Sequence, residues 1–286
     1  MTVGVLARPT AHTEALVLRV WSCGDTSCIA SLLTRQEGFV KVLAKGARGP
    51  RSRLRPLIEP GRLVDVEFSL DPGRELQFLR GGSVELDPLS SDPSLEKSAF
   101  LLGALELIDR CRPLGQAAGN RGTVDLFAVC EDYVRVLSSS SCRAPALLFF
   151  AFEWELLERH GMAPEIDSCL SCGREGEALT ASTLWFSPAE GGLVCAECSG
   201  QATAGMRPLS HRARQLLQQM SHSGLAVSGA DPLDGRLRRE LGAALHHFMG
   251  YHLPGYRLPA ALDLLRRPGR GPEADPPEPD EDQDGD

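Results

Sequence analysis

Four cysteines in two Cys-x-x-Cys pairs have the spacing of a metal site. The first pair is Cys169 and Cys172, and the second is Cys195 and Cys198, with 22 residues between the pairs. Each pair can turn two thiolates toward one point, and four sulfur ligands at about 2.3 Å form the closed tetrahedral site of a structural Zn²⁺ ion. The pattern therefore predicts a zinc ribbon that holds one structural Zn²⁺ per chain and leaves no open position for a substrate.

Two other interpretations of the cysteines compete with zinc. A redox dithiol needs only one Cys-x-x-Cys pair, and disulfides need an oxidising compartment. Five further cysteines stand among apolar neighbours, as expected for reduced, buried thiols in a cytoplasm: Cys23, Cys28, Cys111, Cys130 and Cys142.

A second group of residues is basic and lies between Gly38 and Ile58, where the chain has no acidic residue. The alternation of an extended strand places Val40, Val42 and Ala44 on one face of residues 38–45, and an aromatic ring and two ammonium groups on the other. Such a face suits single-stranded nucleic acid, since cations bind phosphates and rings stack on bases. The alternative is a solvated strand and a solubilising loop. The candidate nucleic-acid-binding residues are Phe39, Lys41, Lys45, Arg48, Arg51, Arg53 and Arg55.

The sequence predicts no catalytic residues. It has no G-x-x-x-x-G-K-[ST] loop, no G-x-S-x-G elbow and no H-E-x-x-H motif. Three carboxylates in one helical segment are expected on its polar side: Glu153, Glu155 and Glu158. Three histidines near the end of another helix are expected in capping or surface roles: His246, His247 and His252. We therefore expect a protein that is not an enzyme.

The acidic net charge of −8 comes from one end of the chain. Residues 272–286 hold eight acidic side chains and no basic one, and without them the basic and acidic residues balance. Such a segment can compete with DNA for a basic surface, contact basic partners, or act as a solubilising extension.

The elements that must position these groups change character along the chain. Five segments rich in Val, Leu and Phe, separated by Gly and Pro turns, predict a small closed barrel of the OB (oligonucleotide/oligosaccharide-binding) type, with an SH3-like barrel as the alternative: Glu14–Cys23, Ser27–Thr34, Gly38–Lys45, Arg62–Leu70 and Glu75–Glu85. Helical periodicity follows, in Leu95–Arg110, Thr123–Ser138, Ala144–His160, Ser210–Met220, Asp234–Met249 and Leu258–Arg267.

The predicted fold class is a multidomain α+β protein. We expect an OB-fold DNA-binding domain (1–86), a helical domain in two parts (87–164 and 203–267), a four-cysteine zinc-binding insertion (165–202) and a disordered acidic tail (268–286). No apolar run approaches the roughly 20 residues of a membrane span, and the N-terminal segment lacks the apolar core of a signal peptide. We expect a cytoplasmic protein with no membrane contact.

Several motifs resemble those of the RecO family of bacterial recombination mediators, in the same order over residues 12–266. They include E-A-L-V-L-R-V, G-D-T-S-C-I-A-S-L-L-T-R-Q-E-G, A-K-G-A-R, S-R-L-R-P-L, E-W-E-L-L-E-R-H-G-M-A-P, F-S-P-A-E-G-G-L-V-C-A-E-C and Y-H-L-P-G-Y-R-L. The acidic tail departs from the usual ending of the family.

The resemblance implies a role without catalysis at the bacterial nucleoid. RecO proteins bind single- and double-stranded DNA, anneal complementary strands, and with RecR help RecA load onto DNA coated by single-stranded DNA-binding protein (SSB). They hold the acidic, Phe-ended C-terminal tail of SSB in an apolar and basic site on the helical domain. Two alternatives are an enzyme with an OB domain, such as a nuclease, and a zinc-stabilised protein-interaction scaffold without a direct DNA role.

Overall fold

The computed structural model describes residues 9–110, 119–176, 179, 183–200, 205–229, 231–253 and 255–265. Cys111 and the acidic tail lie outside the described residues.

The N-terminal strands close into a barrel in the order β1-β2-β3-β5-β4, with β4 paired back to β1. Only the β3–β5 pairing is parallel, and the 3-10 helix η1 (Arg55–Ile58) connects β3 to β4. This five-stranded topology is that of an OB fold and decides against the SH3-like alternative. The strands are β1 (Thr10–Cys23), β2 (Ser27–Thr34), β3 (Gly38–Ala44), β4 (Leu63–Ser69) and β5 (Leu76–Leu86).

The barrel interior follows the predicted alternation of β3. Val42 and Ala44 are fully buried inside the barrel with Leu32 and Phe68, and Val40 packs against this cluster. The opposite side of β3 is therefore the outer face of the barrel, as expected from the sequence.

A helical region follows, with α4 at its centre. Twelve of the fifteen residues of α4 are buried, which agrees with its apolar sequence. α3 begins four residues before Thr123, and the predicted last helix is a 3-10 turn, η3. The bounds are α1 (Leu95–Arg110), α3 (Gly119–Ser138), α4 (Pro145–Arg159), α7 (His211–Ser223), η2 (Gly224–Gly229), α8 (Gly235–His252) and η3 (Ala260–Leu265).

A small sheet between α4 and α7 carries the four cysteines. Its strands are β6 (Leu184–Ser187), β7 (Gly192–Cys195) and β8 (Arg207–Leu209), in the order β7-β6-β8, and the short helix α6 (Ala196–Ser199) follows β7. Gly192 lets the backbone of Glu165 approach β7, because a Cβ at this position would lie 2.1 Å from the Glu165 carbonyl oxygen. The first cysteine pair is thereby attached to the sheet that holds the second.

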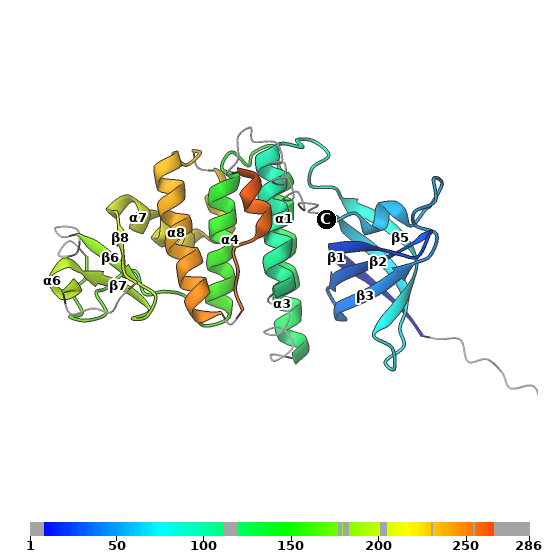
Figure 1. The fold of residues 1–286 in the computed structure, drawn as a ribbon, viewed down its shortest axis with the longest axis horizontal. Helices are drawn as coiled ribbons and strands as arrows, with labels where there is room; N and C mark the ends of the chain where they lie inside the picture. The colour runs from blue at the N-terminus through cyan, green and yellow to red at the C-terminus, as the bar shows by residue number, and fades with distance from the viewer. Residues whose placement is uncertain are drawn as a thin grey trace, which may run out of the picture.

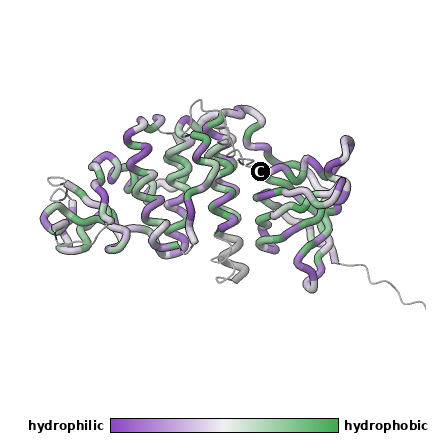
Figure 2. The backbone as a smooth tube through the Cα atoms, viewed as in Figure 1, coloured by the Kyte–Doolittle hydropathy of each residue, from purple (hydrophilic) through white to green (hydrophobic). Residues whose placement is uncertain are grey.

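The three parts lie along the long axis of the molecule (Figure 1), with the barrel at one end, the helices in the middle and the small sheet at the other end. Hydrophobic residues concentrate in the strands and central helices, and loops are largely hydrophilic (Figure 2). α1 and α3 contact β1, and Leu16, Leu18 and Leu33 on the outer face of the barrel belong to the helical core. Within the described ranges, no helix is long and apolar enough to cross a bilayer.

Candidate nucleic-acid interface and metal centre

The four cysteines converge on one point. Their sulfur atoms all lie within 4.8 Å of one another, and those of Cys172 and Cys195 are 3.9 Å apart. Zn–S bonds of about 2.3 Å give a tetrahedron with edges of about 3.8 Å, so the cluster has the size that a metal ion needs. We call these four residues the cysteine cluster.

Backbone N–H groups stabilise the ionised form of one cysteine of the cluster. The Cys195 N–H points at the Cys169 sulfur at 3.3 Å. Burial opposes ionisation of Cys169, but hydrogen bonds from the backbone of Cys195, Cys172 and Ser171 outweigh it and lower the pKa of this thiol to about 6. Gly173, at a φ of +69°, turns the chain so that its N–H reaches the Cys169 carbonyl oxygen at 2.8 Å. All-sulfur donors in this geometry fit a closed site of the zinc type.

The structure places Phe39 at the junction of the barrel and the helices. This ring does lie on the outer face of β3, but the helical region covers this end of the face, and Phe39 packs against the helical core. It is half-buried between the two parts of the protein, so only part of its ring is exposed, and its contact with DNA stays a prediction. The sequence could not reveal this, because the covering residues come from a separate, later part of the chain.

The two lysines of β3 differ in environment. Lys41 is half-buried and forms an ion pair with Glu75, which the sequence places 34 residues away. Lys45 is exposed, and its ammonium lies 4.9 Å from the centre of the Phe78 ring on β5, in a cation–π contact. The face is therefore less positive than the local sequence indicates, and Lys45 is its more accessible cation.

The four loop arginines are all exposed: Arg48, Arg51, Arg53 and Arg55. Their loop is held by backbone hydrogen bonds, among them the Arg48 N–H to the Thr26 carbonyl oxygen at 2.9 Å. Arg48 also donates from its side chain to the Gly24 carbonyl oxygen at 3.2 Å, and Arg55 lies 4.0 Å from Glu59. The loop is thus held in place by hydrogen bonds and is positively charged. It lies beside the turn between β1 and β2.

Sequence analysis missed two residues of the same face, Arg19 and Trp21 on β1. Arg19 pairs with Ser31 of β2, which pairs with Lys41 of β3, so one row crosses three strands. These residues, with Asp109 of α1, line a hollow of about 610 Å³. The Trp21 side chain is exposed, at 36%. We call Arg19, Trp21, Lys41 and Lys45 the barrel face.

A β-bulge places these two residues, Arg19 and Trp21, on the outer face. The register of β1 against β2 shifts between Val17 and Arg19. Simple alternation assigns Val17, Arg19 and Trp21 to one side, and Val17 is buried inside the barrel. The extra residue, Leu18, moves Arg19 and Trp21 to the outside. The sequence did contain a sign that Arg19 lies outside, because an arginine is rarely buried in the interior of a barrel.

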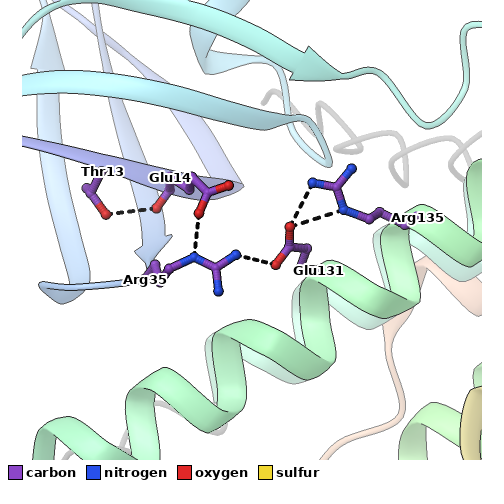
Figure 3. Close-up of polar contacts among 5 residues, drawn as sticks. All are labelled: Thr13, Glu14, Arg35, Glu131 and Arg135. Carbon is purple, nitrogen blue, oxygen red and sulfur yellow. Dashed lines mark hydrogen bonds and ion pairs between the residues drawn. The ribbon is translucent and has the colours of Figure 1, made fainter.

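An arginine clamp joins the barrel to the helices (Figure 3). Arg35, directly after β2, binds the carboxylates of Glu14 on β1 and Glu131 on α3, and lies 4.6 Å from the centre of the Phe127 ring. Burial opposes ionisation of Glu131, yet hydrogen bonds from Arg135 and Arg35 keep the pKa of this carboxyl below its ordinary value. The clamp therefore orients the barrel face relative to the helices.

A second hollow, of about 850 Å³, lies on the helical region. We call it the basic groove. None of the described residues that line it is acidic. Its apolar lining residues include Phe150, Leu258, Leu262 and Leu265, and its basic ones are Arg207, Arg238, Arg239, Arg257, His246 and His247.

A buried carboxylate lies behind the basic groove and corrects a prediction. Glu153, expected on the polar side of α4, is completely buried, with Oε1 3.0 Å from Nε2 of His246. Glu155 and Glu158 are not buried. Burial, together with the Glu153 carboxyl, raises the pKa of Tyr256, another lining residue. His247 and His252 each donate a hydrogen bond from Nε2 to a backbone carbonyl oxygen, that of Gly205 at 3.1 Å and that of Pro188 at 2.9 Å.

Comparison with known proteins gives the family. Models described as "Recombination protein O N terminal" and "Recombination protein O C terminal" match residues 8–85 and 93–261. The chain is 31% identical over 245 residues to the DNA repair protein RecO of Anaeromyxobacter sp. (strain Fw109-5), covering 85% of this chain and 92% of the relative. The chain belongs to the RecO family.

A more distant relative matches over a similar extent. The DNA repair protein RecO of Pelodictyon phaeoclathratiforme (strain DSM 5477 / BU-1) is 26% identical over 260 residues, covering 88% of this chain and 96% of the relative. RecO membership confirms the resemblance seen in the sequence and supports a role in DNA recombination and repair. The metal, the DNA contacts and the protein partners stay predictions.

Proposed function

We propose that this RecO family chain is a recombination mediator. In this proposal it binds single- and double-stranded DNA regardless of sequence, anneals complementary strands, and with RecR helps RecA load onto DNA coated by SSB. It acts in the bacterial cytoplasm at the nucleoid. The observation that carries the proposal is the exposed cationic and aromatic surface of an OB barrel, formed by the barrel face and the loop arginines.

The physical basis is charge, since each cation bound to a phosphate releases counterions and makes binding salt-dependent. Arg19, Lys45 and the four loop arginines are the most exposed cations of this surface. If all six contact phosphates, the logarithm of the affinity for single-stranded DNA falls with the logarithm of salt with a slope of about −4. Trp21 adds stacking on unpaired bases, which duplex DNA does not offer.

Annealing needs no covalent chemistry. Two strands repel each other, and a basic surface that binds both lowers this repulsion while bases remain free to pair. We therefore propose no catalytic residue and no enzyme activity. Incubation with DNA and Mg²⁺ is expected to leave the strands intact, and strand cleavage would contradict the proposal.

The basic groove is the proposed site for the C-terminal tail of SSB. Its apolar side suits the terminal Phe of that tail, and its arginines suit the acidic residues that precede it. The cysteine cluster is proposed to hold one Zn²⁺ as a structural element, because four thiolates leave no open position for a reacting group.

An alternative role is a zinc-stabilised protein-interaction scaffold. Two observations favour it, since Glu75 offsets the charge of Lys41 and the helices cover Phe39. In this case the loop arginines bind an acidic peptide instead of DNA.

Fluorescence anisotropy of labelled oligonucleotides over a salt series separates the two roles. The mediator proposal predicts binding to unrelated sequences with similar affinity and a slope of about −4 for single strands. Absence of binding at low salt, or a strong preference for one sequence, would favour the scaffold.

A further inference from the structure

The described part of the chain ends at the basic groove, and an acidic segment follows it in the sequence. The described chain ends in η3, and Leu262 and Leu265 of this turn line the groove. Only residues 266–271 separate Leu265 from the acidic part of the tail, residues 272–286. Eight carboxylates thus follow, within a few residues of sequence, a residue that lines a surface whose described lining has four arginines and no acidic residue.

The charges of the groove are accessible to a ligand. Arg207, Arg239 and Arg257 are exposed, and Arg238 is half-buried beside Glu96, at 3.4 Å. Arg257 is fixed through its backbone, because Arg110 donates a hydrogen bond to its carbonyl oxygen. Arginine and carboxylate groups form strong charge-assisted hydrogen bonds.

We propose that the acidic tail of this chain docks in the basic groove and competes there with acidic peptides from partners. The competition with the SSB tail rests on the function proposed above, whereas docking itself does not. A polar chain of about 20 residues has an end-to-end distance of about 25 Å. Measured from Leu265, which lines the groove, this length is enough to span the groove.

The strength of the contact follows from the composition of the tail. Besides its acidic residues, the segment 272–286 has only Pro, Ala, Gln and Gly, so it has no large apolar side chain for Phe150 and the leucines of the groove. The contact between the tail and the groove therefore depends on charge alone, and salt weakens this contact. Attachment to the same chain gives an effective concentration on the order of 1 mM, which populates even a contact with a Kd of about 0.1–1 mM.

These values set the expected inhibition. Occupation by the tail raises the apparent Kd of a competing peptide about 2- to 10-fold at low salt. A peptide that also fills the apolar side of the groove displaces the tail. By competing for the groove, the tail thus favours the binding of ligands that combine acidic residues with an aromatic side chain.

The test compares the full chain with a variant in which the eight carboxylates are replaced by Asn and Gln. The probe is a labelled peptide with the sequence of the cognate SSB tail, and its Kd is measured by anisotropy from low to high salt. Tail docking predicts about 2- to 10-fold tighter binding to the neutral-tail variant at low salt, and equal binding at high salt. Equal affinity at all salt concentrations would overturn docking and leave the proposed SSB site intact.

Two control substitutions locate the tail. Arg239→Ala in the groove is expected to reduce the difference between the two tails, whereas Arg51→Ala in the barrel loop should preserve it. Loss of the difference only in Arg51→Ala would place the tail on the barrel and refute the proposal.

Hydrogen exchange gives a readout that needs no partner. The full chain should protect residues 235–247 of α8 more than the neutral-tail variant does at low salt. If neither protein binds the probe, the proposed SSB site is wrong, and this comparison still decides whether the tail docks. Identical exchange in both proteins would overturn docking.

Discussion

Replacement of Trp21 by alanine should weaken the binding of single-stranded DNA about 5- to 10-fold. Stacking of a base on an aromatic side chain contributes about 1–3 kcal/mol. Trp21 is 36% exposed, so only part of its ring is available, and the low end of about 1–1.4 kcal/mol applies. Duplex DNA should lose little affinity, because its bases are already stacked on one another.

The intrinsic fluorescence of the protein reports on this contact. The chain has three tryptophans, of which Trp154 is buried and Trp185 lies in the distant β6. Quenching by an unlabelled single strand should therefore come mainly from Trp21. Trp21→Phe should retain most of the affinity, and Trp185→Phe is the matched control with unchanged affinity and quenching.

One result would refute this reasoning. If Trp21→Ala binds single strands as tightly as the original protein, while circular dichroism shows that the barrel is folded, the barrel face does not stack on bases. Equal losses for single strands and duplexes would likewise show that Trp21 contributes through the shape of the surface and not through stacking.

Three further predictions concern the loop, the metal and the clamp. Alanine at all four loop arginines should weaken binding to unrelated DNA sequences equally and make the salt slope for single strands shallower by about 3, measured by anisotropy; an unchanged slope would exclude the loop from the interface. Cys195→Ser should lower the zinc content measured by mass spectrometry and speed hydrogen exchange in residues 165–202 without abolishing annealing; a zinc-free original protein would contradict its premise. Arg35→Ala should lower the free energy of unfolding by about 1–2 kcal/mol in urea titrations, since it leaves Glu131 without one of its partners. Because the pKa of Glu131 is lowered in the folded protein, this loss should be full above pH 4.5 and shrink as acid protonates the carboxyl; a loss that grows in acid would refute this assignment.

The sequence predicted what depends on local spacing. The two Cys-x-x-Cys pairs meet as expected, because each turn is made within a few residues and the strands between them bring the turns together. The alternation of β3 correctly assigned Val42 and Ala44 to the barrel interior. The five strands and the apolar α4 were likewise visible in the sequence.

The sequence did not predict the environment of side chains that depends on distant segments or on a local irregularity. Phe39 is covered by helices that come later in the chain, and Glu75 reaches Lys41 from another strand. Trp21 lies on the outer face because of one bulge residue in β1, which simple alternation from Val17 does not include. Glu153 looked like a surface carboxylate, but its partner His246 comes from α8, and only the packing of α8 on α4 brings the two together.

The most direct test of the mediator role is the annealing of complementary oligonucleotides coated with cognate SSB. The annealing rate is measured with and without this protein across a salt series. We expect an acceleration that declines as salt rises and that is lost when the loop arginines are replaced by alanine. No acceleration at any salt concentration, by a protein that still binds bare DNA, would contradict the mediator role.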